Sequence, residues 1–256
     1  MIRLLSLACC LVAALPVLAA EIKTRDRRSG FDFMTPSSQD MQRDDMLNPG
    51  MLWVLEGEAL WQQQAANAPS CAGCHGDAKD SMRGAAARYP AFNDRLNRPI
   101  NLQQRINLCR SKNQQQPAFE PESRPLLALS AFIGAQSRGL PIAPPEDARL
   151  APHLENGRQF FKTPMGQLGL SCAQCHDDNW GGRLAGAPIP QAHPTGYPIY
   201  RLEWQTLGSL QRRLRNCLTG IRAEPFDWDA PEMVELELYL MKRAAGMNIE
   251  TPAVRP

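Results

Sequence analysis

Cys71-Ala72-Gly73-Cys74-His75 and Cys172-Ala173-Gln174-Cys175-His176 are two copies of one pattern, C-x-x-C-H, in a chain of 256 residues. This pattern is typical of covalent haem attachment, in which two thiols add to the vinyl groups of one porphyrin and the histidine binds the iron as the proximal ligand. A zinc site would need four ligands at each pair, and the chain has 8 Cys and 4 His. A thioredoxin-type redox pair would not need the histidine. The sequence therefore predicts two c-type haems, attached through Cys71, Cys74, Cys172 and Cys175, with His75 and His176 as iron ligands.

The overall composition excludes other broad classes of protein. The 28 Lys+Arg and 26 Asp+Glu give a net charge of +2, without the strong basic excess of a nucleic-acid-binding protein. One long apolar run, Leu4 to Leu18, follows Arg3 and ends in small residues, which indicates a cleavable secretory signal over residues 1–20. We therefore expect a periplasmic protein with no membrane span after cleavage. Cys9 and Cys10 would leave with the signal, and six cysteines would remain.

The sequence around the two haem motifs repeats. Leu102 to Cys109 and Leu210 to Cys217 both read L-Q-x-R-[I/L]-x-x-C, and each follows a Tyr-Pro pair at the same distance. Apolar residues recur at helical rather than strand spacing, so the predicted fold is all-α, with two tandem cytochrome c-type domains. The expected organisation is a signal peptide over 1–20, an extended N-terminal arm over 21–45, a first domain over 46–140, a Pro-rich linker over 141–150 and a second domain, carrying the active site, over 151–256.

Cys109 and Cys217 are not part of either haem motif. In an exported protein a disulfide between them is the ordinary expectation. However, each occupies the same place in its own repeat, which favours a distal ligand to each haem iron instead. Rival distal ligands are histidines and methionines that do not repeat at a shared position: His153, His193, Met82, Met233, Met241 and Met247.

A thiolate ligand would lower the reduction potential of its haem, and its sulfur would be a candidate nucleophile. The two repeats differ in charge near this sulfur. Arg213 lies one helical turn before Cys217 and has a counterpart in Arg105. The second repeat also has four cations at positions that are uncharged in the first repeat. Arg212, Arg215, Lys242 and Arg243 stand where the first repeat has Gln104, Asn107, Ala135 and Gln136. Guanidinium groups bind oxyanions, so this asymmetry predicts an anion site beside Cys217. The alternative is a solvated basic face that balances Glu232, Glu235 and Glu237.

Together, these residues resemble the SoxA family, dihaem cytochromes c of the periplasmic sulfur-oxidising (Sox) complex. The resemblance spans nearly the whole mature chain and is carried by both haem motifs, by the sequence around Cys109, by Arg213 to Pro225 and by the tail from Gly246 to Arg255. It implies an L-cysteine S-thiosulfotransferase that pairs with the monohaem cytochrome SoxX. Such an enzyme joins thiosulfate oxidatively to a cysteine of the carrier SoxYZ and passes two electrons on.

The resemblance also implies roles for single residues. His75 and Cys109 would ligate the first iron, and His176 and Cys217 the second. Cys217 would be the catalytic cysteine, found as a persulfide in the family, and Arg213 would bind the substrate anion with help from Lys242 or Arg243. Two other functions stay open: a thiosulfate dehydrogenase that forms tetrathionate, and a dihaem electron carrier without catalysis.

Overall fold

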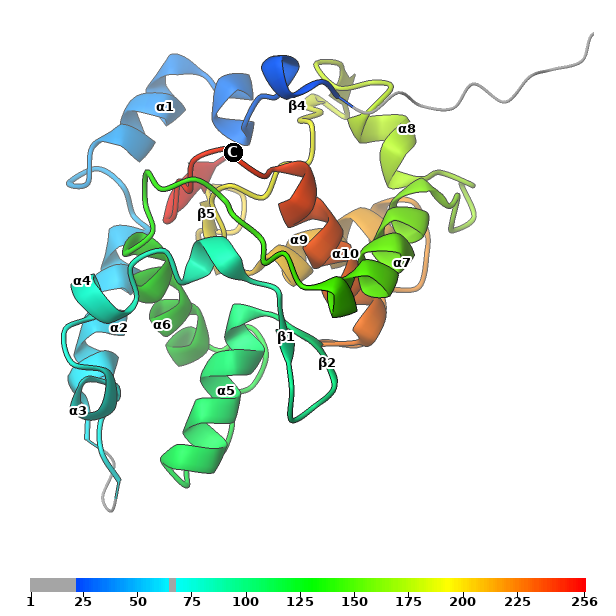
Figure 1. Cartoon of the computed structure of the whole chain (residues 1–256). Helices are drawn as coiled ribbons and strands as arrows, with labels where there is room; N and C mark the ends of the chain where they lie inside the picture. The colour runs from blue at the N-terminus through cyan, green and yellow to red at the C-terminus, as the bar shows by residue number, and fades with distance from the viewer. Residues whose placement is uncertain (1–21, 65–67) are drawn as a thin grey trace, which may run out of the picture.

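The computed structural model describes residues 22–64 and 68–256, so the expected signal peptide lies outside the described residues. The fold is mostly helical, as predicted (Figure 1). The helices are α1 (Pro36–Arg43), α2 (Met51–Gln62), α3 (Cys71–His75), α4 (Ala78–Ser81), α5 (Leu102–Asn113), α6 (Arg124–Ala135), α7 (Ala151–Lys162), α8 (Cys172–His176), α9 (Leu210–Gly220) and α10 (Pro231–Arg243). The short strands are β1 (Ala91–Asn93), β2 (Arg98–Ile100), β3 (Arg183–Leu184), β4 (Ala187–Pro188), β5 (Ile199–Arg201), β6 (Thr206–Gly208) and β7 (Ala253–Arg255).

The internal repeat is present in the structure down to the register of its hairpins. In each half, a long helix leads into the one-turn helix of the haem motif, and a hairpin and two further helices follow. Ala91 is paired with Ile100 in the first hairpin, and Ile199 with Gly208 in the second, which are the same positions of the repeat. The helix that carries the spare cysteine begins directly after each hairpin, so α5 and α9 hold equivalent places.

In each half, a glycine allows two long helices to cross closely. A Cβ at Gly57 of α2 would lie 2.2 Å from the Ala128 carbonyl oxygen of α6. A Cβ at Gly157 of α7 would lie 2.1 Å from the Glu235 carbonyl oxygen of α10. Any side chain at either position would force the helices apart, so the glycines fix the frame on which each haem motif is mounted.

Within the described residues, three apolar clusters form the core. The first packs α2 against α6 around Trp53, Trp61 and Phe132. The second packs α7 against α10 around Phe161 and Tyr239. The third lies between the halves and brings together residues from distant parts of the chain: Ala87, Ile142, Met241, Ala244 and Ile249.

The two ends of the described chain lie together on the second half. Strand β7 pairs in parallel with β5, and α1 contacts β7. The N-terminal segment, blue in Figure 1, lies beside this C-terminal end. The expectation of an extended arm was wrong for residues 36–43, which form a helix because Thr35 caps its start and Pro36 stands in its first turn. Within the described residues, no helix is long and apolar enough to cross a bilayer.

Candidate haem sites

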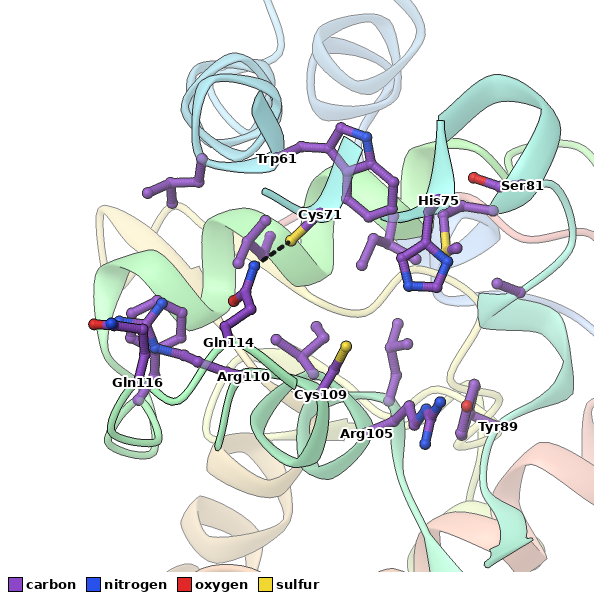
Figure 2. A pocket seen from close by; sticks show the side chains of 18 of the residues that line it. Trp61, Cys71, His75, Ser81, Tyr89, Arg105, Cys109, Arg110, Gln114 and Gln116 are labelled. Carbon is purple, nitrogen blue, oxygen red and sulfur yellow. Dashed lines mark hydrogen bonds between the residues drawn. The ribbon is translucent and has the colours of Figure 1, made fainter. Parts of the chain in front are cut away.

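The first haem motif opens onto a large cavity. Cys71 and His75 of α3 line it together with Cys109 of α5, and its volume is about 610 Å³. Figure 2 shows the His75 imidazole and the Cys109 sulfur directed into this space from opposite sides. Most of the wall is apolar or aromatic, and the volume falls in the range of cofactor pockets, about 300–1,000 Å³. Donor set, shape and wall therefore fit a covalent haem with histidine on one side and sulfur on the other.

Local sequence explains why each motif presents its three haem-binding side chains together. Ser70 caps α3 by accepting a hydrogen bond from the Gly73 amide, and Gly76, at a φ of 69°, ends the helix after a single turn. Ser171 caps α8 in the same way, and Gln174 completes a capping box. One helical turn places both thiols and the imidazole within reach of a single porphyrin.

The second motif faces a cavity of about 150 Å³, lined by His176 and Cys217. The imidazole and the thiol meet across it in a hydrogen bond, and the Nδ1 atom of His176 lies 2.6 Å from the Pro190 carbonyl oxygen. That second contact orients the ring so that its other nitrogen is turned toward the sulfur. The donors fit a haem as they do in the first site. Because this cavity is smaller than the first, the fit to a haem depends here on the donor atoms of His176 and Cys217 and not on the cavity volume.

Cys109 and Cys217 line different cavities, and both are free thiols. The alternative of a disulfide between them is therefore wrong for this structure. Of the rival ligands, Met82 lines the first cavity and His193 the second. His193 is tied through Nδ1 to the Arg28 carbonyl oxygen at 2.8 Å, and burial lowers its pKa to about 4.

The remaining rival ligands lie away from both cavities. Met233 is fully buried in the core, and Met241 and Met247 pack between the halves. His153 lies 2.6 Å from Glu235. These side chains are explained by packing and pairing, so Cys109 and Cys217 are the residues that occupy equivalent places opposite the two histidines.

Cys217 lies in a positive environment. Burial alone would raise the pKa of its thiol, but the hydrogen bond with His176 and the charges of Arg213 and Arg201 outweigh burial, so the pKa lies below its ordinary value. Arg213 lines this cavity, as predicted for a residue one turn before Cys217 on α9. Arg201 and Arg255 line it too, and neither was predicted from the sequence.

Lys242 and Arg243 were expected at the same anion site, and the structure does not bring them there. Leu240 lines the cavity, and on a helix the residue two positions later points to nearly the opposite side, so Lys242 faces solvent. Arg243 is buried and lies 2.6 Å from Asp177, the residue that follows His176. Its charge is thus paired, and its place is behind the haem motif rather than in the cavity.

Two segments of the chain, residues 56–142 and 156–249, match the family model described as SoxA/TsdA, cytochrome c domain. A SoxA protein of Rhodovulum sulfidophilum, named L-cysteine S-thiosulfotransferase subunit SoxA, is 34% identical over 89% of this chain and 80% of its own length. The chain belongs to the SoxA family. The family's cytochrome c domain implies covalently bound haem, and each matched segment contains one C-x-x-C-H motif and one spare cysteine.

Other SoxA proteins also match this chain over most of its length. The SoxA protein of Paracoccus pantotrophus is 32% identical over 89% of this chain and 78% of its own length. The crystal structure of SoxXA from P. pantotrophus superposes with a TM-score of 0.86 at 31% identity, covering 90% of this chain and 87% of the other. The likeness therefore extends across both halves of this SoxA protein.

Proposed function

We propose that this SoxA protein is the catalytic subunit of a periplasmic L-cysteine S-thiosulfotransferase that joins thiosulfate to a cysteine of a SoxYZ-like carrier protein. The observation that carries this proposal is the position of Cys217, half-buried opposite His176 in a cavity that also contains Arg213. The names of the SoxA relatives support the activity. The likeness to SoxXA of P. pantotrophus supports a SoxX-like monohaem partner.

Two covalent haems are part of the proposal. Cys71 and Cys74 would hold the first, and Cys172 and Cys175 the second. His75 and Cys109 would ligate the first iron, and His176 and Cys217 the second, because these pairs face each other across the two cavities. The haems would supply one-electron acceptance and transfer to the partner cytochrome.

The chain's own residues would bind thiosulfate and position its sulfur. The Arg213 guanidinium donates hydrogen bonds well suited to the oxygens of a dianion. In the net reaction, the carrier thiolate and thiosulfate form one S–S bond, giving a carrier S-thiosulfonate and releasing two electrons. The charge balances, since three negative charges on the reactants become one on the product and two on the electrons. In this proposal the sulfur of Cys217 takes part in forming this bond.

The decisive test replaces one spare cysteine at a time. In Cys217→Met, the sulfur ligand is kept but the nucleophilic thiol is lost, so we expect conjugation to the carrier to disappear while both haems stay attached. Cys109→Met is the matched control and should keep conjugation. The mass of the carrier after incubation with thiosulfate reports the product. Full conjugation by Cys217→Met would overturn the proposal.

The same assay separates the two alternative functions. A thiosulfate dehydrogenase would form tetrathionate from thiosulfate alone, and the family model that matches this chain covers both SoxA and TsdA proteins. The relatives from R. sulfidophilum and P. pantotrophus are SoxA proteins, which favours the carrier-dependent reaction. Formation of tetrathionate without a carrier would support the dehydrogenase. If neither tetrathionate nor the conjugated carrier were formed, the protein would be an electron carrier without catalysis.

A further inference from the structure

The cavity at Cys217 contains three arginines from three different elements: Arg201 at the end of β5, Arg213 on α9 and Arg255 on β7. The guanidinium of Arg255 is already engaged, because it lies 2.5 Å from Glu250 and also contacts Gln42. It holds the C-terminal strand in place. Among the residues that the structure describes, the Arg213 guanidinium has no hydrogen-bond partner and Arg201 keeps one buried donor, Nε, without an acceptor.

The hydrogen-bond donors of the Arg201 guanidinium group are only partly satisfied. Its Nη2 atom lies 2.8 Å from Glu203, a carboxylate that is 63% exposed. Its Nε atom is buried and has no hydrogen-bond partner within residues 22–64 and 68–256. A buried donor without an acceptor costs free energy, so the site is built for an acceptor that the protein itself does not provide.

The two guanidinium groups also act on each other. Both line the same cavity; burial is the main cause that lowers the pKa of Arg201, and the charge of Arg213 lowers it further. Two cations facing one partly buried space repel each other unless an anion lies between them. A doubly negative oxyanion would offset both charges and would satisfy the Nε donor.

A comparison of the two repeats shows which arginine position lines both cavities and which lines the second cavity alone. Arg213 is equivalent to Arg105, and both line the cavity of their own half. Arg201 is equivalent to Asn93, because Asn93 pairs with Arg98 in the first hairpin as Arg201 pairs with Thr206 in the second. Asn93 does not line the first cavity. The arginine common to both halves serves a need they share, whereas Arg201 belongs to the second site.

We propose that Arg201, acting with Arg213, binds the oxygens of thiosulfate, and that Arg201 makes the second cavity rather than the first the thiosulfate site. This inference rests on the proposed function and names the residue that gives its substrate specificity. Trp204 supports the geometry, since the Arg201 guanidinium lies over its ring, 5.2 Å from the centroid. Stacking on the ring fixes the plane of the Arg201 guanidinium group and leaves the N–H groups at its edge available for hydrogen bonds.

The test measures thiosulfate binding calorimetrically on the full, haem-loaded chain with no carrier present. Arg201→Gln should raise the Kd for thiosulfate roughly 10- to 100-fold, as expected for loss of a charged hydrogen-bonding partner. Arg201→Lys keeps the positive charge but not the planar guanidinium group, so it should raise the Kd for thiosulfate by a smaller factor. Arg212→Gln is the matched control, because Arg212 lies over the same Trp204 ring at 4.3 Å but does not line the cavity. It should bind thiosulfate like the unchanged protein.

Each outcome decides the matter. An unchanged Kd in Arg201→Gln, an equal increase in Arg212→Gln, or no thiosulfate binding by the unchanged protein would overturn the role of Arg201. A shift in the second haem's reduction potential with an unchanged Kd would show that Arg201 contacts a haem propionate instead, and would also overturn it. Conjugation is measured separately: if the unchanged protein binds thiosulfate through Arg201 but does not modify the carrier, the proposed function fails and the binding role stands.

Discussion

At the scale of single residues, the two spare cysteines occupy equivalent places but have different neighbours. Asn113 lies one turn after Cys109 on α5, and its side-chain amide donates a hydrogen bond to that sulfur at 3.4 Å. The equivalent position in the second half is Ile221, which has no such donor. The second sulfur instead has the positive charges of Arg213 and Arg201 nearby. Hydrogen bonds to a sulfur ligand tune the potential of its metal centre, so the two haems are expected to differ.

Replacing Asn113 should therefore change one haem selectively. A hydrogen bond withdraws charge from a thiolate and favours the reduced iron, so Asn113→Leu should lower the reduction potential of the first haem. If loss of this hydrogen bond costs on the order of 1 kcal/mol, the reduction potential should fall by about 40 mV, because the couple transfers one electron. A redox titration followed by absorption would measure it, with Ile221→Leu as the control that should leave both potentials in place. Equal potentials in Asn113→Leu and the unchanged protein would contradict the assigned hydrogen bond.

At the scale of elements, each half depends on one close crossing of two helices. Gly157 of α7 faces the backbone of α10 at Glu235, and the Cβ of Tyr239 would lie 2.9 Å from an added Cβ. The backbone cannot yield as the end of a flexible side chain can. This crossing supports both α8, which carries the haem motif, and the Leu240 wall of the cavity.

Gly157→Ala should therefore destabilise the second half, even though alanine is intrinsically the better helix former. Overpacking of this kind costs roughly 1–3 kcal/mol, and the free energy of unfolding from urea titration would measure it. Gly220→Ala is the control, because a Cβ at that position of α9 meets nothing within 4 Å. Equal stability of the two variants would show that the helices can move apart without cost.

The sequence predicted the helices well and the small elements poorly. Strands of three residues, such as β1 and β5, are too short to show an alternating pattern, so Arg201 at the end of β5 could not be connected with Cys217. Helix α1 lacks an apolar stripe, although Thr35 and Pro36 are recognisable start signals. The error at Lys242 has another cause: the repeat showed which positions of α10 differ in charge, but not which side of the helix faces the cavity.

At the scale of the whole molecule, a buried carboxylate joins the two halves. Glu237 of α10 is 8% exposed and accepts hydrogen bonds from Asn101, the N-cap of α5, at 3.1 Å and from Gln211 of α9 at 2.8 Å. The alternative left open by the sequence, a solvated basic face that balances Glu237 among other carboxylates, was wrong for this residue, because Glu237 is buried. Periodicity within one helix cannot show that a second domain covers it, because the covering residues come from a distant part of the chain.

This carboxylate should make the stability of the protein depend on pH. Burial is the main cause that raises the pKa of Glu237 from 4.5 to about 7, and the nearby charge of Asp229 adds to it, against the hydrogen bonds from Asn101 and Gln211. Between these pH values the folded chain holds a proton that the unfolded chain has lost. Stability is therefore greatest below pH 4.5 as far as this group is concerned, and falls by about 3 kcal/mol as the pH rises through 7.

Glu237→Gln should remove this part of the pH dependence, because an amide keeps a similar shape and hydrogen-bonding capacity but carries no charge at any pH. The free energy of unfolding, measured by urea titration at pH 5 and pH 8, should then fall less between the two values than it does in the unchanged protein. Glu232→Gln is the matched control on the exposed start of the same helix and should keep the original difference. If Glu237→Gln kept it too, the carboxylate at the junction of the halves would be charged and solvated in the folded protein, and the halves would meet less closely than the contacts of Asn101 and Gln211 require.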